Sequence, residues 1–175
     1  MTQAVLILTG GQSRRMGQDK SQLQYKGQAL VDWQCSRFSA VGFQVVSQLA
    51  DRFPGFLGPL AGIDAALAQF PHIKHWVVVP VDMPKLSTQI VDTLFTQGAQ
   101  KSAPVAFENA PMPIYLNNNP ELIQTLESWL NDEQGKRSVY ALLTQLKGHW
   151  LPNTDKAEEL ENFNTPAEWQ AALSN

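Results

Sequence analysis

The sequence predicts a three-layer α/β/α fold built on a mostly parallel sheet with a short antiparallel edge. Strand-like and helix-like patterns alternate along the chain, and this alternation is typical of parallel sheets covered by helices. The run 76–79 is continuously apolar, as expected of a central strand buried on both faces. A second apolar run, 4–8, leads directly into two glycines, which indicates a strand followed by a tight loop.

The first half of the chain supplies two strands and two helices. The apolar run 4–8 is the first predicted strand. Apolar residues at 30, 33, 38 and 41 separated by polar ones predict a helix over 30–40, and Val45-Val46 begins a second strand. Residues 60, 63, 67 and 70 have helical spacing and follow Gly58-Pro59, so a second helix is predicted over 60–70.

The second half continues the pattern after strand 76–79. Ser87 is a predicted helix cap for a helix to about residue 97. The runs 104–107 and 114–116, joined by residues 108–111, predict two short antiparallel strands at an edge. Helical patterns follow over 120–130 and 138–146, and Thr165, Pro166 and Glu168 have the spacing of a final helix start.

Length and composition indicate one compact enzyme-sized domain spanning 1–175. With 43% hydrophobic residues and a net charge of −3, the chain can bury one core and is not expected to bind nucleic acid. Cys35 is the single cysteine, and the three histidines form no zinc pattern with it. No stretch is long and apolar enough for a membrane span or signal peptide, so a cytoplasmic location is expected.

The loop after the first strand has the chemistry of a phosphate site. Gly10-Gly11 allows backbone N–H groups to approach phosphate oxygens, and Arg14, Arg15 and Lys20 add positive charge. Five residues separate Gly11 from Gly17, and Lys20 comes three residues later, so neither a Walker A loop nor a dinucleotide fingerprint fits. The alternative is a glycine turn with solvated surface cations.

Asp82 is the predicted metal ligand. It follows the buried strand 76–79 and lies between Pro80 and Pro84, which restrict the turn. Mg²⁺ needs only one or two carboxylates when phosphate oxygens and water complete its shell. The alternative is an aspartate that only shapes the turn.

The candidate residues follow strands whose carboxyl ends meet at one edge. Ligands of open parallel sheets bind beyond that edge. We therefore expect the loop 10–20, Asp51, Gly58-Pro59 and Asp82 to face one crevice.

Four ordered blocks resemble the molybdenum cofactor guanylyltransferases, which are nucleotidyltransferases with a Rossmann-like fold. The blocks are Thr9-Gly10-Gly11 through Asp19-Lys20, Gly58-Pro59-Leu60-Ala61-Gly62, Pro80-Val81-Asp82-Met83-Pro84 and Asn162-Phe163-Asn164-Thr165-Pro166. They extend over essentially the whole chain.

The resemblance implies transfer of GMP from GTP to the terminal phosphate of molybdenum-molybdopterin, with Mg²⁺ as cofactor. It implies catalytic roles for Arg15, Lys20 and Asp82, and it places Asn162 and Asn164 near the metal and the acceptor phosphate. Both asparagines are expected on one face of a terminal strand, although Asn164 could instead cap the last helix. The implied nucleotide-binding residues are Leu8, Thr9, Gly10, Gly11, Lys20, Asp51, Gly58, Pro59 and Asp82.

Several alternatives stay open at this stage. The sister cytidylyltransferases, which use CTP, typically carry Ala-Gly where this chain has Gly10-Gly11, so the GTP branch is favoured. A catalytically weakened nucleotide-binding or cofactor-binding protein is the other reading. Lys136 and Arg137 are candidates for gripping the pterin phosphate, with solvated surface charges as the equal alternative. The resemblance also implies contact with cofactor-maturation proteins and molybdoenzymes.

The chain departs from the family pattern in two places. Thr9 stands where the family usually has alanine, and only residues 47–50 separate Val46 from Asp51, where the family has a longer loop with further elements. Either an αβ element is deleted or Ser47 and Gln48 replace the loop. A more open nucleoside pocket, with weak or relaxed nucleotide affinity, is expected.

Overall fold

The computed structural model describes residues 3–9, 23–55, 57–164 and 168. The strands are β1 (Gln3–Leu8), β2 (Gln24–Tyr25), β3 (Gln28–Ala29), β4 (Gln44–Ser47), β5 (His75–Pro80), β6 (Val105–Phe107), β7 (Ala110–Asn117) and β8 (His149–Leu151). The helices are α1 (Leu30–Ala40), α2 (Pro59–Gln69), α3 (Thr88–Lys101), α4 (Pro120–Asn131) and α5 (Val139–Gln145).

Among the described residues, a six-stranded sheet with the order β4-β1-β5-β7-β6-β8 forms the centre of the fold. The pairs β1–β4, β1–β5 and β6–β8 are parallel, whereas β7 is antiparallel to both β5 and β6. The predicted fold class, a mostly parallel sheet between helical layers, is confirmed. The antiparallel strand β7 lies inside the sheet, between β5 and β6, and β8 takes the edge where the sequence predicts the antiparallel pair.

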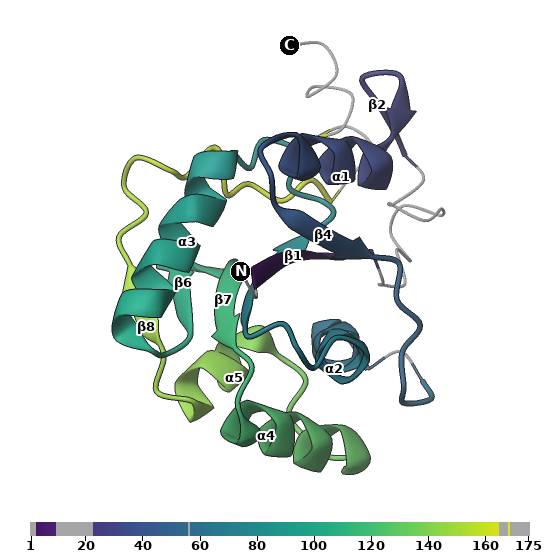
Figure 1. The fold of residues 1–175 in the computed structure, drawn as a ribbon, viewed down its shortest axis with the longest axis vertical. Helices are drawn as coiled ribbons and strands as arrows, with labels where there is room; N and C mark the ends of the chain where they lie inside the picture. Colours follow the sequence, from purple (N-terminus) through teal and green to yellow (C-terminus); the bar gives the residue numbers. More distant parts are fainter. Residues whose placement is uncertain (1–2, 10–22, 56, 165–167, 169–175) are drawn as a thin grey trace.

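Helices cover both faces of the sheet (Figure 1). α1 and α3 pack on one face, where Val5, Ile7, Val77 and Val79 belong to a core cluster with their buried residues. α2, α4 and α5 pack on the other face, against the alternate residues of the same strands. The continuous apolar run 76–79 is therefore buried on both sides, as its sequence predicts.

The predicted elements agree with the observed ones to within a few residues. Ser87 caps α3 as expected, since its hydroxyl accepts a hydrogen bond from the Ile90 amide at 3.3 Å. The hairpin β2–β3 and the strand β8 were not predicted, because pieces of two or three residues carry no periodicity. Between Ser47 and Pro59 the described residues contain no helix or strand, so no element replaces the one that the resemblance leads us to expect there.

The predicted terminal strand at Asn162 and Asn164 is wrong. Residues 161–164 form neither helix nor strand and pair with no strand of the sheet. The segment is fixed instead by Phe163, whose side chain is buried in the core cluster beneath α1 and α3. Of the predicted last helix, only Glu168 lies among the described residues, and it is helical.

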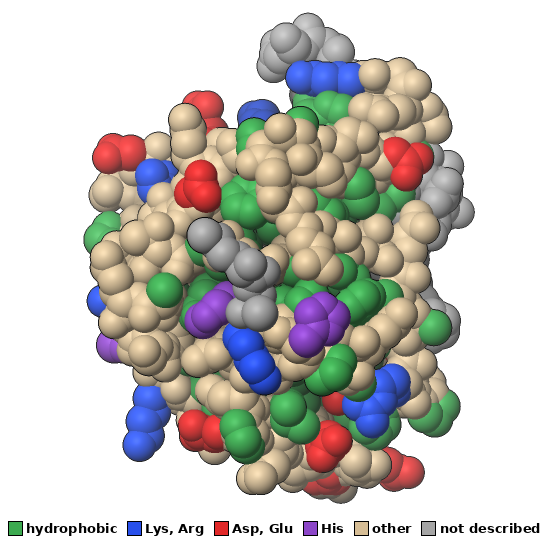
Figure 2. All heavy atoms as spheres, in the orientation of Figure 1, with side chains coloured by type: hydrophobic (Ala, Val, Ile, Leu, Met, Phe, Trp, Pro, Cys, Tyr) green, Lys and Arg blue, Asp and Glu red, His purple; other side chains and the backbone are tan. Residues whose placement is uncertain are grey.

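The face of the molecule shown in Figure 2 carries no large area of one charge. On the face shown in Figure 2, Lys and Arg side chains are scattered among Asp and Glu rather than gathered together. Among the described residues, no helix has both the length and the apolar character that crossing a membrane requires.

Candidate active site

The carboxyl ends of three neighbouring parallel strands lie level with one another. Ile7 of β1 is paired with Ser47 of β4, and Leu8 of β1 is paired with Pro80 of β5. The Val81 amide donates to the Leu8 carbonyl at 3.1 Å, which extends this alignment one residue beyond β5. Thr9 therefore leaves the sheet between the β4–α2 connection and the turn that carries Asp82.

The predicted phosphate loop, residues 10–20, lies outside the described residues, and with it Gly10, Gly11, Arg15 and Lys20. Leu8 is the last residue of β1, and its side chain contacts α2 where Gly62 passes: a Cβ at Gly62 would lie 2.7 Å from the Leu8 Cδ2 atom. The end of β1 is thus fixed against the first turns of α2.

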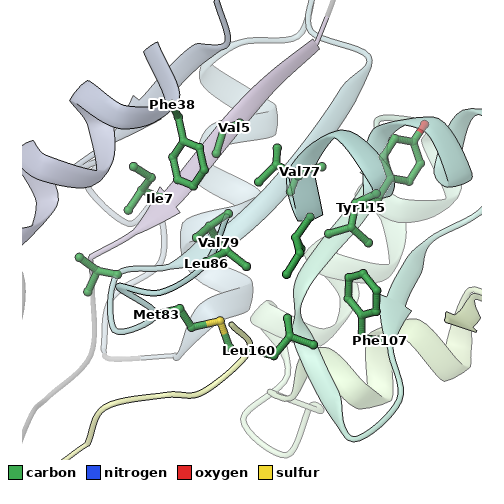
Figure 3. Close-up of a cluster of buried hydrophobic side chains, with 14 of the residues drawn as sticks. Val5, Ile7, Phe38, Val77, Val79, Met83, Leu86, Phe107, Tyr115 and Leu160 are labelled. Carbon is green, nitrogen blue, oxygen red and sulfur yellow. The ribbon is translucent and has the colours of Figure 1, made fainter. Parts of the chain in front are cut away.

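Asp82 lies on a turn whose main chain is held from two sides. From α1, the Gln34 side-chain amide donates to the Val81 carbonyl at 2.8 Å and to the Met83 carbonyl at 3.4 Å. From the C-terminal segment, the Phe163 amide donates to the Asp82 carbonyl at 2.9 Å. Met83 and Leu160 belong to the core cluster that supports this turn (Figure 3).

The C-terminal segment brings both predicted asparagines beside this turn. Asn162 and Asn164 flank Phe163, whose amide bonds to Asp82, and both are exposed. Lys85 and Glu161 form a further link between the two segments, an exposed ion pair of 3.3 Å. The Asn164 amide donates to the Glu168 carboxylate at 2.5 Å, so Asn164 also takes part in the start of the last helix. The bond from the Phe163 amide to the Asp82 carbonyl thus brings the residues on either side of Phe163 next to the Asp82 turn without any strand.

Asp51 lies on the connection from β4 to α2, and this connection runs along the right of the view in Figure 1. It is largely exposed, yet partial burial raises the pKa of its carboxyl. Leu49, Phe53 and Leu57 of the same connection pack against the core on the α2 side. These three apolar anchors hold the short connection in place without any regular structure.

Arg52 and Asp64 form an ion pair that the sequence did not reveal as part of the site. The Arg52 Nη1 atom lies 3.2 and 3.3 Å from the two carboxylate oxygens of Asp64. Asp64 is 3% exposed, whereas Arg52 remains largely exposed. Because Arg52 follows Asp51 directly, the pair ties the Asp51 segment to the second turn of α2. In the sequence, the signal for this ion pair is Asp64 itself, a single charged residue within the otherwise apolar stretch 60–67.

The buried position of Asp64 makes the stability of the fold depend on pH. Burial raises the pKa of the Asp64 carboxyl above its usual 3.8, and Arg52 opposes this rise. The folded protein then holds the Asp64 proton more tightly than the unfolded chain does. The contribution of Asp64 to the free energy of unfolding therefore falls as the carboxyl loses its proton with rising pH. We expect wild type to lose free energy of unfolding relative to Asp64→Asn as the pH rises through and above 3.8, the ordinary pKa of this carboxyl.

This expectation is checked by urea unfolding of both proteins at pH values below and above this pKa. Asp92→Asn, at an exposed position of α3, controls for the loss of a surface carboxylate. A wild-type advantage over Asp64→Asn that grows with pH would contradict it.

Gly58 and Pro59 begin α2 in a conformation that explains both residues. Gly58 has φ +76° and ψ −162°, a region essentially restricted to glycine. Pro59 occupies the first helical position, where its missing N–H costs nothing. The closest atom to a Cβ at Gly58 would be the Arg137 carbonyl oxygen at 3.7 Å, so the loop before α5 borders the start of α2.

Lys136 and Arg137 themselves have partners within this loop. The Arg137 guanidinium donates to the carbonyls of Trp129 and Asp132, the latter at 2.6 Å. Such contacts satisfy carbonyls at the end of α4. The Lys136 ammonium lies 5.4 Å from the centre of the Trp129 ring. The structure thus gives Arg137 a role in fixing the end of α4.

The described residues contain no group of three or more His, Cys, Asp or Glu side chains that could hold a metal ion. A metal that depends on protein ligands alone has no site there. A single carboxylate such as Asp82 suffices only for an ion whose other ligands come from phosphate and water, which is the usual arrangement of Mg²⁺.

A family model described as the MobA-like NTP transferase domain matches residues 5–149. The chain belongs to this family. It is 32% identical to a molybdenum cofactor guanylyltransferase of Xanthomonas euvesicatoria, over 96% of this chain and 93% of that protein. It is 30% identical to one of Shewanella baltica, over 94% and 92% of the two chains. The protein is therefore a nucleotidyltransferase of the MobA-like type.

Solved structures support the fold independently. The chain superposes on the molybdopterin-guanine dinucleotide biosynthesis protein A of Archaeoglobus fulgidus with a TM-score of 0.73 and 24% identity, over 98% and 97% of the two chains. It also superposes on 2-C-methyl-D-erythritol 4-phosphate cytidylyltransferase of Thermus thermophilus, with a TM-score of 0.63 and 16% identity, over 98% and 97%. Proteins named for different nucleotides thus share this fold.

Proposed function

We propose that this MobA-like nucleotidyltransferase transfers GMP from GTP to the terminal phosphate of molybdenum-molybdopterin. An oxygen of that phosphate attacks the α-phosphorus of GTP, and the bond to the β-phosphate breaks to release pyrophosphate. One geometric observation supports this most directly. The turn bearing Asp82 lies one strand away from β1, which leads into the glycine loop, and the Val81–Leu8 hydrogen bond joins their ends.

Each group of residues has a separate role in this proposal. The amides of Gly10 and Gly11, with Arg15 and Lys20, neutralise the phosphates as negative charge moves to the leaving pyrophosphate. The segments around Leu8, Thr9, Asp51, Gly58 and Pro59 hold the nucleoside, and the Asp51 carboxylate can accept hydrogen bonds from guanine or ribose. Asn162 and Asn164 lie next to the Asp82 turn, on the side proposed for the acceptor phosphate.

Mg²⁺ is the proposed metal, and Asp82 is the residue that would hold it. The Asp82 carboxylate is half-buried, and hydrogen bonds to the main chain hold the turn that carries it. One such carboxylate is enough for an ion whose remaining ligands are phosphate oxygens and water. When bound, the ion supplies positive charge at the phosphates. The protein's own contribution is to orient the two anionic reactants, because the nucleophile is already ionised.

The proposal is tested by calorimetric titration with GTP, CTP and ATP, each with and without MgCl₂. We expect GTP to bind more tightly than CTP or ATP, and only in the presence of Mg²⁺. Preference for CTP would instead indicate a cytidylyltransferase. If none of the three nucleotides bound, the chain would instead be a relative of these enzymes with weakened nucleotide binding and catalysis.

The short β4–α2 connection leads to a second expected result in the same titration. We expect GTP to bind more weakly than it does to the Xanthomonas relative measured in parallel, because fewer residues enclose the nucleoside. Equal dissociation constants would show that residues 48–58 close the pocket fully.

A further inference from the structure

The main chain of the Asp82 turn has a donor for each of its carbonyls from 81 to 84. Gln34 donates to those of Val81 and Met83, and the Phe163 amide donates to that of Asp82. The Arg37 guanidinium donates to the Pro84 carbonyl at 3.3 Å. Two of these donors, Gln34 and Arg37, come from one face of α1. This helix therefore holds the residues on both sides of Asp82.

Gln34 is an unusual residue for its position. It is 0% exposed and lies between the buried Leu30 and Phe38 on the inner face of α1. Among the residues that the structure describes, its amide oxygen is buried without a hydrogen-bond partner. An unpaired buried acceptor destabilises a fold, so a purely structural position would be better filled by an apolar side chain of similar size.

We propose that Gln34 is a positioning residue, which fixes the direction of the Asp82 carboxylate by clamping the two carbonyls on either side of it. This inference rests on the proposed function, in which Asp82 holds Mg²⁺ at the nucleotide phosphates. Residues that orient a metal ligand change metal affinity or activity by about 10- to 100-fold when they are replaced. Gln34 makes its contacts through the main chain, so it acts on Asp82 without touching the ligand.

The test compares two buried amides at opposite ends of β5. Gln34→Met keeps the volume and removes the donor to Val81 and Met83. The control is Asn118→Leu, which removes a matching bond in which the Asn118 side-chain amide donates to the Ile73 carbonyl at 3.0 Å. Asn118 follows β7 next to the amino end of β5, away from Asp82. Both variants lose one buried side-chain donor to main-chain carbonyls.

Two readouts separate positioning from stability. The first is the Mg²⁺ concentration that gives half-maximal GTP binding in calorimetry. The second is amide hydrogen exchange of residues 81–86 and Phe163. We expect Gln34→Met to raise the half-saturating Mg²⁺ concentration about 10-fold and to speed exchange in these amides. We expect Asn118→Leu to change neither, even if its thermal midpoint falls further.

A normal Mg²⁺ requirement in a folded Gln34→Met protein would overturn the inference. So would failure of both Gln34→Met and Gln34→Leu to fold, because Gln34 would then serve stability. Asp82→Asn distinguishes this from failure of the proposed function. If Asp82→Asn itself leaves the Mg²⁺ requirement of wild type unchanged, then Asp82 holds no metal and the proposed function fails first.

Discussion

Asp82→Asn is expected to lower the rate of GMP transfer by about 100-fold or more while leaving the fold intact. The substitution keeps the size of the side chain but removes its negative charge. The main-chain bond from the Phe163 amide to the Asp82 carbonyl does not involve the side chain, so the turn keeps this support. The measurement is pyrophosphate release with GTP and molybdenum-molybdopterin at saturating Mg²⁺.

The matched control for Asp82→Asn is Asp92→Asn on the exposed side of α3. It makes the same chemical change away from the strand ends, and its rate should stay within about twofold of wild type. A transfer rate near wild type in Asp82→Asn, at both low and high Mg²⁺, would remove Asp82 from the mechanism. Circular dichroism of both variants confirms that any loss of rate is not a loss of fold.

Much of the fold follows from the sequence because its central strands are buried on both faces. Residues 4–8 and 76–79 contain only apolar side chains, and such runs have few other stable environments in a soluble α/β domain. The helices beside these strands are predicted from the helical spacing of their apolar residues. The position of the Asp82 turn at the carboxyl edge also follows, since it comes directly after β5.

The supports of the candidate site could not be predicted in the same way. Gln34 and Asp82 are far apart in the chain, and a glutamine in a helix is ordinarily an exposed residue. The apolar spacing at residues 30, 33, 38 and 41 predicts a helix, yet Val41, just beyond the end of α1, is 57% exposed and Gln34 is buried. Only packing of α1 against the turn reveals that the polar residue points inward.

The C-terminal segment shows a different limit. Asn162 and Asn164 were expected to share a strand face, and that reasoning failed because residues 161–164 form no strand. Both still lie beside Asp82, since Phe163 is anchored in the core and its amide bonds to the turn. One buried aromatic residue between two exposed polar ones positions the segment here. Alternation of that kind is too short to distinguish a strand from an anchored loop.

Lys20→Met is expected to reduce turnover by about 100- to 1,000-fold, which is the effect of removing one preorganised donor from a developing anion. Lys20 closes the loop segment that begins at Gly10, and the family resemblance assigns it to the nucleotide phosphates. Methionine keeps most of the length of the side chain without its charge. If Lys20 acts on the transition state, kcat should fall; if it only binds GTP, KM should rise with kcat unchanged.

Lys26→Met provides the comparison within the same part of the chain. Lys26 is exposed at the β2–β3 turn, with its ammonium 5.5 Å from the centre of the Tyr25 ring, and no phosphate role is proposed for it. Its loss should change kcat and KM by less than about threefold, because no contact with GTP is proposed for it and salt screens a single exposed charge. If Lys20→Met and Lys26→Met changed kcat and KM equally, GTP would respond only to the net charge of this region and not to a cation at one position. A selective loss of kcat in Lys20→Met would instead show that charge is needed at one position, where pyrophosphate leaves.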